Sequence, residues 1–243
     1  MPVDDRDESS SGASAQTDAN AAAPSPVPRT AGPRATAGAP PIMAEPVRVA
    51  VLISGRGSNM LALSEHKRRD PDRAYRIALV ASNVPDARGL VLAKRLGIRT
   101  WAKSHEGMKR AEFDDMLGEA LTEHDIEIVA LAGYMRLLSP GFVDKWEGRI
   151  LNIHPSLLPL HKGLDTHRRA ILAGDGYGGC SVHVVTADLD AGPVVAQAKV
   201  KILARDDPES LAQRVLEEEH RLYPLALEEY CRAVRELEGE SPA

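Results

Sequence analysis

The fold is decided by one stretch of sequence, Val47-Arg48-Val49-Ala50-Val51-Leu52-Ile53-Ser54-Gly55-Arg56-Gly57-Ser58-Asn59. Its first seven residues are mostly β-branched and almost all apolar, which is typical of a strand buried inside a parallel sheet. The glycines after it permit a tight turn, and a helix that begins there would offer unpaired main-chain N–H groups to an anion. Because neither a Walker A loop nor the pattern G-x-G-x-x-G is present, we expect a monophosphate rather than a dinucleotide. The alternative is an ordinary turn in which Ser58 or Asn59 caps the helix.

Strand and helix patterns alternate along the chain from residue 46 onward. Apolar and β-branched segments predict strands at 47–53, 75–81, 98–101, 126–131, 149–153, 181–185 and 194–202. Amphipathic segments predict helices at 61–66, 87–96, 108–124, 140–146, 165–173 and 209–237, the last interrupted at Pro224. This alternation predicts an α/β fold with a Rossmann-like, mostly parallel twisted sheet and helices on both faces. Ligands of such sheets bind at the carboxyl ends of the strands.

Composition divides the chain into two parts. Residues 1–45 contain no leucine and no aromatic residue, so we expect a disordered low-complexity tail, with Met43 as a second possible start. The tail opens with an acidic run at residues 4–8 and has no apolar core, which argues against a secretory signal. We expect residues 46–238 to form one folded domain. No apolar run approaches the roughly 20 residues that a membrane-spanning helix needs.

Charge and cysteine content narrow the class of protein further. The net charge is −5 and no basic block is present, so we expect small-molecule partners rather than nucleic acid or a membrane. Cys180 and Cys231 lack both metal-ligand spacing and the density of a disulfide scaffold. Reduced thiols and a cytoplasmic location are therefore expected.

Two polar side chains stand two residues apart at the end of a predicted strand, in Leu151-Asn152-Ile153-His154-Pro155-Ser156-Leu157-Leu158-Pro159. Alternate side chains of a strand share a face, and Pro155 should stop the strand at His154. An amide donor beside an imidazole suits acyl chemistry, since one group can bind an oxyanion while the other moves a proton. The alternative is that Asn152 caps a turn and His154 only fills space.

Two further loops carry candidate groups. In Thr186-Ala187-Asp188-Leu189-Asp190-Ala191-Gly192-Pro193, an aspartate could orient an imidazole and stabilise its cation, and Asp190 is favoured because a sharp turn follows it. In residues 133–140, apolar residues around Arg136 could line a slot for a flat ligand with an anionic tail, or form a packed loop with a solvated arginine. Zinc is disfavoured, because the histidines lack helical ligand spacing and a cysteine pair. They are His154, His161, His167 and His183.

Four motifs in this order resemble those of the phosphoribosylglycinamide formyltransferase family. They are Ser-Gly-Arg-Gly-Ser-Asn at 54–59, Gly-Tyr-Met-Arg-Leu-Leu-Ser-Pro at 133–140, Asn-Ile-His-Pro-Ser-Leu-Leu-Pro at 152–159, and Ser-Val-His-Val-Val through Leu-Asp-Ala-Gly-Pro at 181–193. The resemblance runs from about Arg48 to Tyr230 and implies that residues 46–238 are a formyltransferase catalytic domain. It implies transfer of a formyl group from 10-formyltetrahydrofolate, as co-substrate, to the amine of 5'-phosphoribosylglycinamide in purine synthesis. No metal is implied, and a homodimer is left open.

The resemblance also implies roles for individual residues. The catalytic residues would be Asn152, His154 and Asp190. The ribonucleotide would be bound by Gly57, Ser58, Asn59, Met60 and Glu219. The folate would be bound by Arg110, Met135, Arg136, Leu137, Leu138, Asn152, Thr186, Ala187, Asp188, Leu189 and Asp190. The chain departs from the family at Leu216, where a polar residue is often found, and at Asp165, where histidine is also seen.

Three other functions are weighed against the transferase. Formyltetrahydrofolate deformylase would use the same three catalytic residues with water as acceptor, but that family has a folded domain in front that residues 1–45 cannot supply. Methionyl-tRNA formyltransferase has an additional C-terminal domain and a basic face for tRNA. The third is a phosphoribosyl-ligand binding module without catalytic activity.

Overall fold

The fold described here is that of one unit of the chain. In a computed structural model, residues 45–66, 68–70 and 72–239 can be described. The chain divides into two units, Met1–Ile42 and Met43–Ala243, and the described residues belong to the second. The predicted tail at residues 1–45 falls, apart from its last residue, outside the described residues and stays a prediction.

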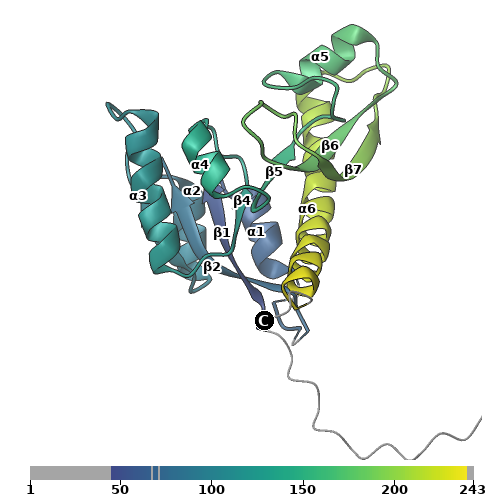
Figure 1. The fold of residues 1–243 in the computed structure, drawn as a ribbon. Helices are drawn as coiled ribbons and strands as arrows, with labels where there is room; N and C mark the ends of the chain where they lie inside the picture. Colours follow the sequence, from purple (N-terminus) through teal and green to yellow (C-terminus); the bar gives the residue numbers. More distant parts are fainter. Residues whose placement is uncertain (1–44, 67, 71, 240–243) are drawn as a thin grey trace, which may run out of the picture. The chain divides into compact units, whose positions relative to one another are not determined.

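A seven-stranded sheet carries the fold of this unit (Figure 1). Its strands are β1 (Val47–Ile53), β2 (Tyr75–Ser82), β3 (Arg99–Ala102), β4 (Ile128–Leu131), β5 (Ile150–His154), β6 (Tyr177–Val184) and β7 (Val194–Lys201). They lie in the order β3-β2-β1-β4-β5-β6-β7. Strands β1 to β5 pair in parallel, whereas β6 pairs in antiparallel with both β5 and β7. The predicted α/β fold with a mostly parallel sheet is thus confirmed.

Helices cover both faces of the sheet, each over its own apolar core. They are α1 (Ser58–Glu65), α2 (Arg88–Arg95), α3 (Arg110–Glu123), α4 (Pro140–Lys145), α5 (Thr166–Ala173) and α6 (Pro208–Gly239). Val49, Val51 and Ile53 of β1 face the core that contains α1, α2 and α6. The residues between them, Ala50 and Leu52, face the core that contains α3 and α4. Because both faces of β1 are buried, its unbroken apolar sequence is explained.

The long last helix differs from the sequence prediction, since Pro224 does not interrupt it. Proline removes one main-chain hydrogen bond, which usually bends or ends a helix. Here the packing of the neighbouring residue offsets that loss. The fully buried Tyr223 donates from its hydroxyl to the carbonyls of Leu131 and Leu151, each at 3.1 Å. These contacts tie α6 to β4 and β5 at the point where it would otherwise break.

Strand β6 also begins earlier than predicted, at Tyr177 rather than Ser181. Residues 178 and 179 are both glycine, which is depleted in strands. The structure shows why glycine is needed there. A Cβ on Gly179 would lie 2.1 Å from the carbonyl oxygen of Ala198 in β7. The two strands therefore approach too closely for a side chain at this position.

The loops that follow β1 and β4 meet at the carboxyl edge of the sheet. The crossovers reverse direction between these two strands, and in open α/β sheets such a point forms a ligand-binding crevice. The Ser54 amide donates to the Gly133 carbonyl at 3.1 Å, and the Met135 amide donates to the Ser54 hydroxyl at 2.8 Å. Among the described residues, no helix has the length and apolar character required to cross a membrane.

Candidate active site

Sheet geometry places three polar side chains on one face beside this edge. Asn152 and His154 alternate along β5, on the face that carries Ile150 into the α3 and α4 core. His183 of β6 is the direct partner of Asn152 in the antiparallel register. Because paired residues point to the same face, Asn152 and His183 must lie side by side. The Asn152 amide nitrogen Nδ2 is 3.1 Å from Nε2 of His183.

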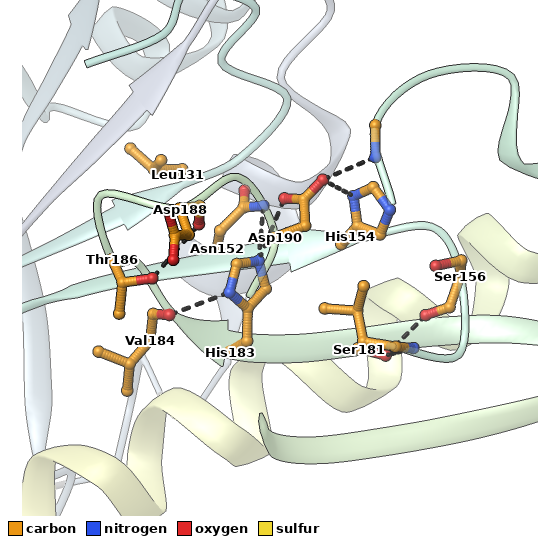
Figure 2. Close-up of polar contacts among 12 residues, drawn as sticks. Leu131, Asn152, His154, Ser156, Ser181, His183, Val184, Thr186, Asp188 and Asp190 are labelled. Carbon is orange, nitrogen blue, oxygen red and sulfur yellow. Dashed lines mark hydrogen bonds and ion pairs between the residues drawn. The ribbon is translucent and has the colours of Figure 1, made fainter. Parts of the chain in front are cut away.

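Asp190 reaches this group from the loop between β6 and β7 (Figure 2). Its Oδ2 lies 3.4 Å from Nδ1 of His154, and its Oδ1 lies 3.6 Å from Nε2 of His183. The main-chain amide of Gly163 donates to Oδ2 at 2.9 Å. The structure therefore brings Asn152, His154 and Asp190 together, from two separate segments of the sequence.

Burial sets the protonation of His154, and local contacts set that of Asp190. The pKa of His154 is lowered from its ordinary value, mainly by burial, which its hydrogen bond to the His161 carbonyl and the Asp190 carboxylate only partly offset. For Asp190, burial acts to raise the pKa. Contacts with His183, with the Gly163 amide and with His154 outweigh it, so the pKa is lowered. At neutral pH the site thus holds a neutral imidazole beside an ionised carboxylate.

The hydrogen bonds of the two rings fix which nitrogen carries the proton. Nε2 of His154 lies 3.1 Å from the carbonyl oxygen of His161, which can only accept, so the proton is on Nε2. Nδ1 of His183 likewise donates to the Val184 carbonyl at 3.0 Å. In a neutral His183 ring, Nε2 can then accept one of the two hydrogens on Asn152 Nδ2. No described residue accepts the second hydrogen of that amide.

A second group of candidate residues lies at the start of α1. Gly57 is the N-cap of this helix, with φ of 78°, so the alternative in which Ser58 or Asn59 caps it is wrong. The first main-chain amides of a helix lack partners within it, which leaves Ser58, Asn59 and Met60 able to donate outward. Asn59 also donates from Nδ2 to Oε2 of Glu219 on α6 at 2.7 Å.

A buried oxygen and a buried carboxylate at this second group are only partly satisfied by hydrogen bonds. Burial raises the pKa of Glu219, and the hydrogen bond from Asn59 only partly offsets this. Asn59 Oδ1 is buried, and no described residue donates to it. Such a pair is costly unless a further partner completes it. The Asn59 and Glu219 pair, 160 positions apart in sequence, is thus suited to hold a polar ligand.

The remaining predicted residues surround this edge in two loops and one helix end. Met135 and Leu137 after β4 and Leu189 after β6 are large apolar side chains that are more than half exposed. The other residues of the second loop, at 186–188, are also exposed, and Leu138 is half-buried. Arg110 is the exposed first residue of α3.

Arg136, in the loop after β4, turns its side chain into the protein. Its guanidinium lies over the ring of the buried Phe113, 4.9 Å from the centroid. Within the described residues nothing accepts from its buried Nε and Nη2. The interpretation of residues 133–140 as a loop with a solvated arginine is therefore wrong. The stacked cation instead supports the loop from below.

The four histidines considered for zinc lie on β5, β6, α5 and the segment between β5 and α5. Across the described ranges, no group of three or more histidine, cysteine, aspartate or glutamate side chains has a metal-binding arrangement. His161 instead contacts Asp175, with Nε2 and Oδ2 2.6 Å apart. His167 is on α5, and burial lowers its pKa.

Comparison with known proteins identifies the family. The formyl transferase family matches residues 47–227, more than half of the chain. Phosphoribosylglycinamide formyltransferase of Escherichia coli K12 is 42% identical over 182 residues, which cover 74% of this chain and 85% of that relative.

The chain belongs to the phosphoribosylglycinamide formyltransferase family.

Other relatives agree with this assignment. The crystal structure of phosphoribosylglycinamide formyltransferase from Brucella melitensis superimposes with a TM-score of 0.73 at 47% identity, covering 77% of this chain and 96% of that one. The human trifunctional purine biosynthetic protein adenosine-3 is 46% identical over 182 residues, 74% of this chain. The chain spans about a fifth of the length of such trifunctional relatives.

Three groups in this candidate site were missed by reasoning from the sequence. His183 was noted as a zinc candidate and as part of the motif at 181–193 but was given no role in the site, although its strand pairs with that of Asn152. The His161 carbonyl and the Gly163 amide are main-chain groups, which contact His154 and Asp190. No side-chain pattern can reveal such contacts, because they depend on the path of the loop.

Proposed function

We propose that this chain transfers a formyl group from 10-formyltetrahydrofolate to the amine of 5'-phosphoribosylglycinamide, a step of purine biosynthesis. The observation that carries the proposal is the convergence of Asn152, His154 and Asp190 at the carboxyl edge of the sheet. The names of the relatives support it, since they describe this formyltransferase or proteins of purine biosynthesis.

The phosphoribosyl substrate would bind at the start of α1. The free main-chain amides of Ser58, Asn59 and Met60, with the positive end of the helix dipole, suit a phosphate. Gly57 is required there because a Cβ on it would lie 2.7 Å from Cα of Gly89. The Glu219 carboxylate suits sugar hydroxyls, which donate hydrogen bonds.

The folate would bind between the loop after β4 and the loop after β6. The exposed Met135, Leu137 and Leu189 offer apolar contact to a flat ring. The other folate-binding candidates are Arg136, Leu138, Asn152, Thr186, Ala187, Asp188 and Asp190. Arg110, at the start of α3, suits the anionic tail of the folate.

In the reaction, the glycyl amine attacks the formyl carbon, and negative charge develops on the formyl oxygen. The second hydrogen of Asn152 Nδ2 is available to donate to that oxygen. His154 Nδ1, unprotonated at neutral pH, accepts the proton that the amine loses and then delivers it to the departing folate nitrogen. Asp190 stabilises the imidazolium formed in between. Orientation of both substrates in one crevice supplies the remaining acceleration.

His183 acts on this reaction through Asn152. In the neutral ring with its proton on Nδ1, Nε2 accepts from the amide, and Asn152 then presents its NH₂ end rather than its carbonyl to the crevice. His183 is therefore a positioning residue for the oxyanion donor.

The experiment that tests the function measures formyl transfer with glycinamide ribonucleotide and 10-formyltetrahydrofolate, beside a reaction without acceptor. Turnover only with the acceptor supports the transferase. Equal turnover without it would indicate the deformylase, and binding without turnover would indicate a non-catalytic module.

We further propose a cytoplasmic location and small-molecule substrates rather than nucleic acid. Mass determination in solution would decide between a monomer and a homodimer.

A further inference from the structure

The orientation of His154 depends on one main-chain carbonyl. Its Nε2–H donates to the His161 carbonyl at 3.1 Å, while its other nitrogen is 3.4 Å from Asp190, longer than a good hydrogen bond. The carbonyl is therefore the shorter and better defined of the two contacts. It keeps the proton on Nε2 and leaves Nδ1 free to accept one.

His161 holds this carbonyl in place with a backbone that few side chains adopt. Its φ is 51°, in the left-handed region, which is unfavourable for residues other than glycine. Such a conformation persists only when its surroundings hold it. The contact that holds the side chain is with Asp175, in the turn between α5 and β6, where Nε2 and Oδ2 are 2.6 Å apart. Both side chains are largely buried, at 15% and 28% exposure.

The same short segment also serves the second catalytic residue. Two residues after His161, the amide of Gly163 donates to Asp190 Oδ2 at 2.9 Å. On either side, Ser156 Oγ donates to the Leu160 carbonyl, and Arg169 donates to the carbonyl of residue 162. Residues 161–163 thus supply one acceptor to His154 and one donor to Asp190.

We propose that Asp175 and His161 are a positioning pair for the formyl-transfer site. Their contact holds the His161 backbone, which fixes the Nε2–H form of His154 and keeps its Nδ1 beside the Asp190 carboxylate. Neither side chain touches substrate. The inference rests on the proposed function for its kinetic effect, but not for its effect on the His154 ring.

The test compares Asp175→Ala and His161→Ala with the conservative variant His161→Gln, whose side-chain amide can still donate to Asp175. The two alanine variants should lose about 10- to 100-fold in kcat, the range expected for slight misplacement of a reacting group. KM for both substrates should change less than threefold, and His161→Gln should keep most of the activity. Matched controls are His124→Gln, which removes a histidine bonded to a main-chain carbonyl at the opposite end of the sheet, and Asp206→Asn.

A second measurement does not depend on turnover. Nitrogen-15 NMR of the imidazole rings should show His154 as the Nε2–H form in the wild type and in His161→Gln, and as a mixture in Asp175→Ala. Wild-type kcat in both alanine variants, or an unchanged His154 signal in them, would overturn the inference. If the wild type itself transfers no formyl group, the proposed function fails, and the NMR result still decides the positioning role. If Asp175→Ala does not fold, Asp175→Asn and His161→Ala give the same two readouts.

Discussion

Replacing Asn152 by alanine should remove the oxyanion donor and leave the binding of both substrates almost intact. Of the two hydrogens on Nδ2, one is taken by His183, so the variant removes a single donor from the crevice. Loss of one such donor is worth about 10²–10³ in kcat, or roughly 2.7–4 kcal/mol. The variant also leaves His183 Nε2 without its partner, which should lower the free energy of unfolding by about 1–3 kcal/mol.

Steady-state formyl transfer, measured with each substrate varied in turn, checks this prediction. We expect kcat to fall while KM stays within threefold, because the interaction exists only as charge develops. His183→Gln alone should lose less, and Asn152→Ala with His183→Gln should be no slower than Asn152→Ala, since His183 acts through that amide. A kcat within threefold of the wild type in Asn152→Ala would show that Asn152 is not the oxyanion donor. Fully additive losses in the double variant would refute the role of His183.

Four further predictions concern neighbouring groups. Asp190→Asn should lower kcat/KM by about 10²–10⁴. Because the Asp190 carboxylate raises the pKa of His154, the acid limb of the pH profile of kcat/KM should move to lower pH in this variant. An acid limb at the wild-type pH would contradict this prediction. Gly57→Ala should lower the free energy of unfolding by about 1–3 kcal/mol in urea, whereas Gly141→Ala, whose added Cβ meets nothing within 4 Å, should not. Because burial raises the pKa of the Glu219 carboxylate, ribonucleotide binding by the wild type should weaken as pH falls, as measured by titration calorimetry. Glu219→Gln should abolish this pH dependence. Burial lowers the pKa of His154 and His167 in the folded state, so below their ordinary pKa of 6.5 the unfolded chain binds protons more readily than the folded chain. The free energy of unfolding, measured in urea, should therefore fall as the pH drops from about 7 to 5. In His167→Gln this fall should be less steep.

The sequence predicted the fold because the strands of this sheet carry a local signal. The apolar run at β1 and the regular spacing of strands and helices follow from burial on both faces. Where local signals and packing disagree, the prediction failed. Pro224 was expected to break α6, but Tyr223 holds the helix against two strands. Glycine 178 and 179 were expected outside β6, but β7 lies too close for any other residue at 179.

The candidate site could be predicted from the sequence only where the spacing of side chains along one segment indicates their position. Asn152 and His154 are two residues apart in a strand, so their shared face follows from its geometry. The approach of Asp190 to His154 depends on the loop after β6, and the contact between Asn59 and Glu219 joins residues that are 160 positions apart in the sequence. The main-chain carbonyl of His161 carries no signal in the sequence at all. These long-range contacts are set by tertiary structure alone.

The central claim is that Asn152, His154 and Asp190 pass a formyl group from a folate to a ribonucleotide amine. The most direct test mixes the purified protein with 10-formyltetrahydrofolate and glycinamide ribonucleotide and measures both tetrahydrofolate and formylated ribonucleotide. The account predicts equal amounts of the two products, no tetrahydrofolate without the acceptor, and at most about a hundredth of the wild-type rate in Asn152→Ala. Tetrahydrofolate formed at the same rate without the acceptor, or an unimpaired Asn152→Ala, would contradict it.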